Sequence, residues 1–139
     1  MYLVKYFIFS SLFTSLLLAS NWLELPNSVV DTKHKLQWQD TKALQEYEEK
    51  WKMAKAHCQG LTLEGFHDWH IPTQNELITL SQSKEGKRVF RYIDSQIFWA
   101  KEEDADDPVN AFTIYIGNGH SSSNDKCETN NIMCVRDNN

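Results

Sequence analysis

The chain has 139 residues, with 14 Lys and Arg against 19 Asp and Glu and a formal net charge of −5. This length is enough for one domain, and an aromatic content of 12% argues against a disordered chain. The acidic balance and the lack of a Lys/Arg cluster argue against nucleic acid or an anionic membrane surface as the partner.

The first twenty residues have the pattern of a secretory signal peptide. Lys5 is their only charged residue, an apolar stretch of about fourteen residues follows, and the segment ends on the small residues Ala19 and Ser20. We expect cleavage near Ser20, which leaves residues 21–139 as a single domain of 119 residues with a net charge of −6 and no membrane span. Asn21 stands where a lipoprotein needs its lipidated cysteine, so no lipid anchor is expected. The alternative is an uncleaved anchor helix, although a span needs roughly 20 apolar residues.

The first elements predicted in the domain are a short strand and an amphipathic helix. Residues 36–39 alternate between apolar and polar, as in a half-buried strand. Asp40 and Thr41 are favoured N-cap residues, and apolar residues then recur at intervals of three and four, which places them on one helix face. Gly60 is expected to end this helix in a left-handed conformation. The buried face would consist of Leu44, Tyr47, Trp51, Ala54 and Cys58.

A second helix is predicted after residue 73, because a capping box precedes it. In this motif the Thr73 hydroxyl accepts a hydrogen bond from the Glu76 amide, and the Glu76 side chain accepts one from the Thr73 amide. Pro72 fixes the chain direction at the start of the helix. Residues 83–88 are expected to form a polar loop after it. The buried side of the helix would consist of Leu77, Ile78 and Leu80.

The rest of the domain is predicted to form short strands and loops. Strands are expected at 98–100, 111–116 and 132–136, where apolar residues form a buried run or alternate with polar ones. A Gly-Asn-Gly turn follows the middle strand. Two loops are expected between these strands, an acidic one at 101–107 and a polar one at 120–125.

The three cysteines, Cys58, Cys127 and Cys134, fit an exported protein. An oxidising compartment would pair two of them and leave one free, and the residues alone allow three pairings. Zinc binding is a weaker explanation, because the chain contains no Cys-x-x-Cys or His-x-x-x-His spacing.

The motifs of the domain follow one another in the order of a known family. Trp-x-x-Ala-x-x-x-Cys begins at residue 51, Asp-Trp-x-x-Pro-Thr-x-x-Glu begins at residue 68, and shorter motifs stand at 36–39, 98–100 and 134–136. This series resembles the C-terminal domain family of the Legionella collagen-like protein over about residues 25–137. The motif residues that we expect to be structural are Trp38, Trp51, Asp68, Trp69, Pro72, Thr73, Glu76, Trp99 and Arg136.

The resemblance implies an α+β, C-type-lectin-like fold, in which two helices pack on a small twisted antiparallel sheet with long late loops. It also implies a disulfide between Cys58 and Cys134, which match cysteine positions of the family motifs, whereas Cys127 lies outside them. Asp68 and the family's arginine at position 70 would orient the turn into the second helix, and His70 replaces that arginine here. The other departures are His34 and Lys35 for Thr-Gly, Ile71 for Leu and Ala100 for Ser.

No residue pattern in the chain points to catalysis. No serine stands in the context of a nucleophile such as Gly-x-Ser-x-Gly. His67, Asp68 and His70 would offer a metal two imidazoles and a carboxylate, but their spacing matches no standard site. Cys127 and Cys134 resemble only faintly the reactive pair of formylglycine-generating enzymes, whose domains are much longer. We therefore expect a protein that is not an enzyme and has no catalytic residue and no cofactor.

The expected function is binding by an exported domain, in the periplasm or at the cell surface. Variable loops on a fixed scaffold are where recognition usually lies, so we place it between about residues 100 and 126. The partner would be a glycan or another extracellular polymer, and a negative domain should prefer a neutral or basic partner to a sulfated glycan. The alternative is an envelope structural or assembly protein with no small ligand.

The acidic loop is the candidate ligand site, with calcium as the one metal considered for it. Carboxylates in a flexible loop are the ligands that calcium requires, although the order of residues in an EF-hand is missing. The alternative is a solvated loop without a ligand. The candidate residues are Glu102, Glu103, Asp104, Asp106 and Asp107.

Overall fold

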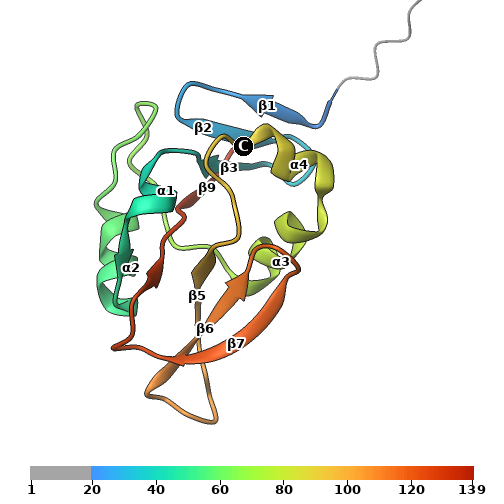
Figure 1. Ribbon diagram of the computed structural model, residues 1–139. Helices are drawn as coiled ribbons and strands as arrows, with labels where there is room; N and C mark the ends of the chain where they lie inside the picture. Colours follow the sequence, from blue (N-terminus) through green and yellow to red (C-terminus); the bar gives the residue numbers. More distant parts are fainter. Residues whose placement is uncertain (1–19) are drawn as a thin grey trace, which may run out of the picture.

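The computed structural model describes residues 20–139, which form four helices and nine strands (Figure 1). The predicted signal peptide, residues 1–20, lies outside the described residues except for Ser20. No helix in the described part is both long enough and apolar enough to cross a membrane. The helices are α1 (Ala43–Glu46), α2 (Trp51–Gln59), α3 (Gln74–Gln82) and α4 (Lys84–Val89). The strands are β1 (Trp22–Glu24), β2 (Ser28–Asp31), β3 (Leu36–Gln39), β4 (Glu48–Glu49), β5 (Ile97–Glu103), β6 (Asn110–Tyr115), β7 (His120–Asp125), β8 (Asn130–Asn131) and β9 (Val135–Asp137).

The strands form two sheets, and the predicted α+β class is confirmed. The first sheet has the order β1-β2-β3-β9, so the last strand of the chain pairs with a strand from its beginning. The second sheet has the order β4-β8-β5-β6-β7, in which β5 and β8 are parallel and the other pairs are antiparallel. The C-type-lectin-like assignment within this class stays a prediction.

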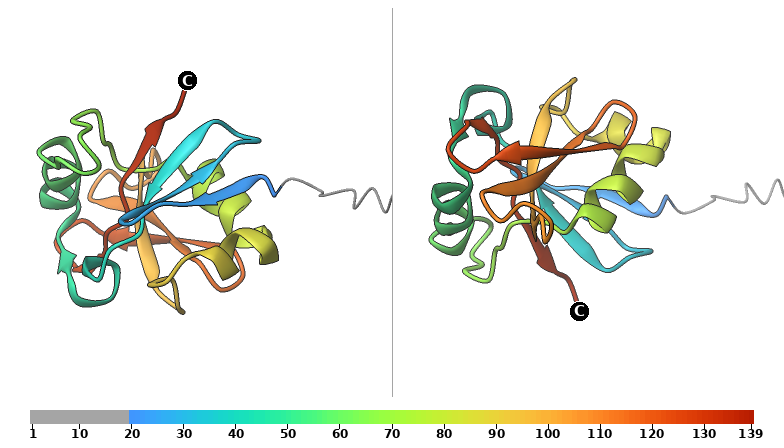
Figure 2. Two further views of the ribbon diagram at one scale, coloured as in Figure 1. Left: turned by 90° about the horizontal axis from the view of Figure 1, so that it is seen from above. Right: turned by 90° about the horizontal axis from the view of Figure 1, so that it is seen from below.

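Strand β5 is buried on both faces and separates two hydrophobic cores. Phe98 and Ala100 belong to a core that includes Leu77 of α3, whereas Trp99 belongs to a core that includes Trp51 of α2. Successive side chains of a strand point to opposite faces, so one strand can serve both cores. In agreement with this division, α2 lies on one side of the strands, and α3 and α4 lie on the other (Figure 2).

The predicted helix over residues 40–58 is wrong as one continuous element. The backbone is extended at Tyr47, with φ −112° and ψ 121°, so α1 ends there and α2 begins only after β4. Strand β4 pairs with β8, and the Trp99 Nε1 donates a hydrogen bond to the Glu49 carbonyl at 2.8 Å. These tertiary hydrogen bonds replace helical ones. Tyr47 is consequently 36% exposed, whereas the other four residues of the predicted face are buried.

The predicted ends of that helix are also corrected. The Asp40 carboxylate caps no helix and accepts hydrogen bonds from the amides of Arg91 at 2.9 Å and Tyr92 at 3.1 Å. Lys42 is the N-cap residue of α1 and makes no side-chain cap. Gly60 follows α2 with φ −90° and ψ −2°, a right-handed conformation. Asp40, which the sequence pattern predicts to be an N-cap residue, thus connects two segments that are distant in sequence.

The capping box of α3 is confirmed. The Glu76 amide donates to the Thr73 hydroxyl at 3.1 Å, and the Thr73 amide donates to the Glu76 carboxylate at 2.9 Å. Leu77 and Leu80 are buried, as their spacing predicts, and Ile78 packs partly buried against the same core.

The predicted loop at 83–88 is a helix instead. Residues 84–89 form α4, and the Ser83 side chain caps it by accepting a hydrogen bond from the Gly86 amide at 2.9 Å. A Cβ atom added at Gly86 would lie 2.5 Å from the Trp22 ring. The helix therefore packs closely on β1, and only a glycine at position 86 permits this. The polar sequence of the segment does not indicate this packing.

The predicted polar loop at 120–125 is strand β7, paired along its length with β6. The predicted turn at 117–119 is correct, and Gly119 adopts φ +80°, a conformation that favours glycine. The predicted acidic loop is shorter than expected, because β5 extends to Glu103. The closing strand β9 starts at Val135 rather than at residue 132.

A disulfide joins Cys58 of α2 to Cys134, the residue before β9, as the family resemblance implied. The two cysteines are 76 positions apart, and both are fully buried. Cys127 is a free, exposed cysteine. The bond therefore joins the C-terminal segment to α2, whose buried residues belong to the same core as Trp99.

Replacing both Cys58 and Cys134 with alanine should lower the free energy of unfolding by about 4 kcal/mol, as the chain-entropy model gives for a loop of this length. Chemical denaturation under oxidising conditions measures the loss. Cys127→Ser is the matched control and should leave the stability unchanged because that thiol is exposed. A larger loss in the control than in the double variant would contradict the assignment.

Candidate functional site

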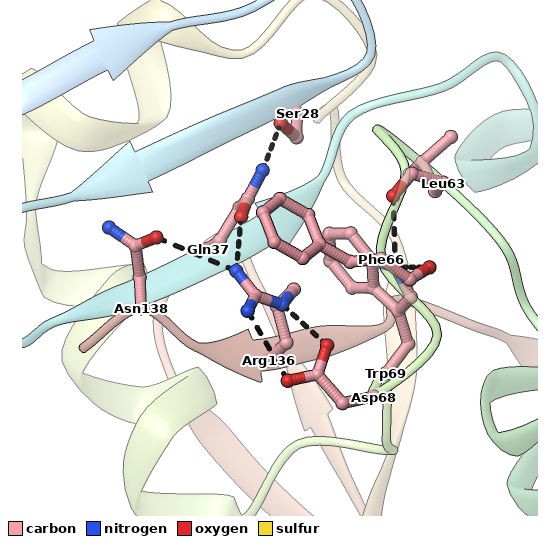
Figure 3. A network of polar contacts seen from close by, with 8 residues as sticks. All are labelled: Ser28, Gln37, Leu63, Phe66, Asp68, Trp69, Arg136 and Asn138. Atoms are coloured by element: carbon pink, nitrogen blue, oxygen red, sulfur yellow. Dashed lines mark hydrogen bonds and ion pairs between the residues drawn. The ribbon is translucent and has the colours of Figure 1, made fainter.

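The guanidinium of Arg136 on β9 joins three segments of the chain (Figure 3). Its Nε and Nη2 donate to the two oxygens of Asp68 at 2.6 and 3.3 Å, and its Nη1 donates to the Gln37 amide oxygen at 2.7 Å. The Gln37 side chain in turn donates to the Ser28 hydroxyl at 2.9 Å. Arg136 is only 8% exposed, so these partners compensate for burying its charge.

An aromatic ring covers the same guanidinium. The carbon at its centre lies 3.6 Å from the ring centroid of Phe66. The Phe66 carbonyl accepts a hydrogen bond from the Trp69 indole at 3.1 Å, and the Leu63 carbonyl accepts a second one at 3.3 Å. Figure 3 shows these groups converging on one turn. Their mutual contacts give the motif a role in the fold.

The side-chain partner of Asp68 is distant in sequence. Its carboxylate binds Arg136, which comes from the other end of the domain. The His70 Nδ1 lies 3.0 Å from the Ile71 carbonyl, and the His70 backbone forms a bridge with Val135 of β9. Histidine at position 70 therefore leaves the central ion pair of the motif intact.

The remaining motif residues also hold elements together. The Trp51 indole donates to the Ala100 carbonyl at 2.9 Å, which connects α2 to β5. The Pro72 carbonyl accepts from the Lys101 amide at 2.8 Å, which fixes the start of α3 against the same strand. Trp38 is 1% exposed on β3.

The acidic residues at 102–107 are bound to several different partners. Glu102 accepts a hydrogen bond from the Gln74 amide at the start of α3 at 2.9 Å, and Glu103 forms an ion pair with Lys126 at 3.1 Å. Asp107 accepts from the Asn110 side chain at 3.3 Å. Among residues 20–139, no three His, Cys, Asp or Glu side chains are grouped as a metal ion would require.

Asp104 organises the turn between β5 and β6. It accepts hydrogen bonds from the Ser123 hydroxyl at 2.6 Å and from the Asp106 amide at 3.0 Å, and these bonds hold the pKa of Asp104 below its usual range. Ser123 lies on β7, so this turn is connected to the polar strand beside it. The two predicted late loops thus lie side by side, and the candidate carboxylates other than that of Asp106 have structural partners.

The imidazoles of the other metal candidate are separated by their contacts. His67 lies 2.9 Å from the Thr62 hydroxyl, His70 contacts a backbone carbonyl, and Asp68 binds Arg136. The three side chains therefore do not form a common ligand set.

A groove lies between the start of α2 and the end of β7. We call it the α2–β7 groove; its volume is about 410 Å³. Met53 and Val109 are 55% and 61% exposed in it. Lys126 also approaches the Trp51 ring, with its Nζ 4.8 Å from the centroid. The groove is lined by Lys50, Lys52, Met53, Val109, Asp125, Lys126 and Cys127.

Part of this groove lies in the segment where the sequence analysis expects binding, and the rest lies outside it. Val109, Asp125 and Lys126 lie in or beside the late segments where binding was expected. Lys52 and Met53 lie on the side of α2 that the apolar periodicity leaves facing solvent. An exposed methionine beside lysines was the only available signal, and it is a weak one.

Comparison with known protein families identifies the family of this chain. Residues 27–136 match the model of the Lcl C-terminal domain. The chain belongs to that family. The matched residues include both cysteines of the disulfide. They also include the four hydrogen-bonded side chains around the guanidinium, which are Ser28, Gln37, Asp68 and Arg136. Strand β1 lies outside the match. A search of curated proteins found no match.

The pairing with Arg136 holds the pKa of Asp68 below its usual range in the folded Lcl C-terminal domain. A carboxyl with a lowered folded pKa stabilises the fold above its unfolded pKa, and this contribution is lost as the pH falls through the folded value. The Asp68→Asn variant lacks this titrating group. As the pH is lowered below about 4, its free energy of unfolding should therefore fall less than that of the wild type. Thermal melting at several pH values tests this, with Asp137→Asn, an exposed carboxylate on β9, as control.

Proposed function

We propose that this protein is an extracytoplasmic binding domain without catalytic activity, and that its α2–β7 groove holds a glycan or another extracellular polymer. The observation that carries the proposal is the exposure of two apolar side chains, Met53 and Val109, within one groove of about 410 Å³. Exposed apolar patches with a polar rim often mark binding sites.

The rim of the groove suggests the chemistry of the partner. Lys50 and Lys52 are exposed, and they give this region a local positive charge although the whole chain has a charge of −5. Apolar side chains can pack on the C–H faces of a polymer, while ammonium groups donate to its hydroxyl or acidic oxygens. The partner we propose therefore has apolar faces and oxygen-rich edges, as a polysaccharide does.

The family and the cysteines support the location that we propose. A buried disulfide between residues 76 positions apart is typical of an oxidising compartment. Together with the leader pattern of the sequence, this supports export to the periplasm or the cell surface.

An envelope protein is the second candidate for the partner. Cys127 is an exposed thiol in the lining of the groove, next to apolar side chains that a protein surface could cover. A role in envelope assembly would therefore use the same groove with a different class of ligand.

The double variant Met53→Asp/Val109→Asp tests the groove. It should fold normally, because both side chains are more than half exposed, and should lose at least about tenfold in binding, since carboxylates would replace the apolar contact. Binding is measured on a glycan array, with and without calcium, and by capture from envelope extract. Leu23→Asp, at a residue 52% exposed on β1, is the matched control.

Equal binding by the double variant and the control would show that the groove is not the site. Capture of one envelope protein that depends on the groove, with a silent glycan array, would favour the assembly role instead.

The proposed export predicts the mass of the mature protein. Protein isolated from the envelope fraction should begin near Asn21, because the leader would have been removed after Ser20. Intact-mass spectrometry measures this directly. A species that retains Met1 would contradict the proposed cleavage.

A further inference from the structure

A small basic pocket lies between α2, the segment before α3 and β5. We call it the Lys55–Lys101 pocket; its volume is about 190 Å³, less than half that of the α2–β7 groove. The pocket and the groove share no lining residue. The pocket is lined by Lys55, Gln59, His70, Ile71 and Lys101.

Three segments that are distant in sequence bring the lining side chains together. Lys55 and Gln59 are four positions apart on α2, so they lie on the same face of that helix. The Lys101 amide on β5 donates to the Pro72 carbonyl at 2.8 Å, which fixes this strand against the segment before α3. The His70 backbone is hydrogen-bonded to β9 in both directions, at 2.8 and 2.9 Å. The backbone around the pocket is therefore fixed by hydrogen bonds to regular elements.

The charge that lines the pocket is positive. No Asp or Glu lines it, and neither of its lysines forms an ion pair within residues 20–139. The acidic neighbours have other partners, because Glu102 accepts from the Gln74 amide at 2.9 Å and Asp68 binds Arg136. Two ammonium groups beside one pocket repel each other, and an anion between them would relieve this repulsion. The pocket therefore attracts an anion locally, although the whole chain has a charge of −5.

Two further side chains of the pocket can both donate and accept hydrogen bonds. The His70 Nδ1 lies 3.0 Å from the Ile71 carbonyl, which can only accept, so a neutral His70 carries its proton on Nδ1. Nε2 is then the ring nitrogen that remains for a ligand, as an acceptor in the neutral form and a donor in the protonated form. The Gln59 amide also offers a donor and an acceptor. A matching ligand has two negative charges, several acceptor oxygens and a proton to donate.

We propose that the Lys55–Lys101 pocket binds a phosphoryl group, either as inorganic phosphate or at the end of a small phosphate monoester. The charge of the group matches the two lysines, and its oxygens accept from ammonium and amide donors. Because its second pKa is about 6, the group still carries a proton part of the time at neutral pH and can donate it to His70. Sulfate has no such proton, and a carboxylate has only one charge, so both fit less well. The site is independent of the proposed function, since it uses different residues.

The test is nuclear magnetic resonance of the ¹⁵N-labelled protein, observed at the backbone amide signals of Gln59, His70 and Lys101. The probes are inorganic phosphate and glycerol 3-phosphate, with sulfate and acetate as counterparts, all at one ionic strength and about pH 7. We expect at least one of the two phosphates to shift these signals in a saturable way and to bind more tightly than sulfate and acetate. The tighter of the two phosphates shows whether the free ion or a monoester is the ligand.

Variants connect the shifts to the pocket. Lys55→Met and Lys101→Met each remove one charge and keep the length of the side chain, and each should weaken phosphate binding at least about tenfold. Lys52→Met is the matched control, because this exposed lysine of α2 lines the groove instead, and it should bind phosphate as the wild type does. His70→Arg replaces the acceptor with a permanent donor, so it should reduce the preference for phosphate over sulfate. Melting temperatures confirm folding, and Lys101→Met remains informative if Lys55→Met is unstable.

Three results would overturn the proposal. The first is that neither phosphate shifts the three amide signals in a saturable way. The second is that sulfate binds the wild type at least as tightly as the phosphates, which would reduce the pocket to an unselective basic surface. The third is that folded Lys101→Met binds phosphate as tightly as the wild type, or no more weakly than Lys52→Met. Because the pocket and the α2–β7 groove share no residue, failure of either site leaves the other testable.

Discussion

The position of β9 is the constraint on which the rest of the structure depends. Arg136 on this strand reaches β3 through Gln37 and the turn before α3 through Asp68, and Cys134 binds α2 covalently just before the strand begins. The backbone of Val135 pairs with Trp38 on one side and His70 on the other. A single short strand therefore joins elements from both ends of the domain. These contacts are long-range in sequence, so they form only when the chain has the correct topology.

The segment formed by this strand and the residue before it also belongs to both cores. Val135 is buried in the core of α3, whereas Cys134 is buried in the core of α2, just as Phe98 and Trp99 divide between them on β5. Strands buried on both faces need continuous apolar sequence and leave little room for substitution. The motif tryptophans supply volume in these cores, and Trp51 and Trp99 also donate indole hydrogen bonds to backbone carbonyls. The structural role predicted for these residues thus has a specific basis in packing and backbone hydrogen bonding.

Local patterns predicted the elements that depend on local contacts. The capping box of α3 and the turn at 117–119 could be inferred from these patterns, and the α+β class was implied by the family resemblance. The break at Tyr47 could not, because pairing of β4 with β8 and the indole of Trp99 determine it. Strand β7 was hidden by its polar composition, and α4 by a polar sequence that packs through Gly86. The pairing of Asp68 with Arg136 joins residues 68 positions apart, and periodicity contains no information on such a contact.

The side chains that line the hollows of this domain lie beside residues that the scaffold fixes. Met53 is exposed between Trp51 and Ala54, which are buried in the core of α2, and His34 stands in a turn that leads into the buried strand β3. The turn itself carries a local cost, because Lys35 adopts φ +54° where the family pattern has glycine. A side chain on such a rigid support loses little further freedom on binding, so contacts made there are used for affinity rather than for ordering the protein. Substitutions at these exposed positions would therefore leave Arg136 and the disulfide undisturbed, and a domain built in this way can keep one fold while its exposed side chains vary.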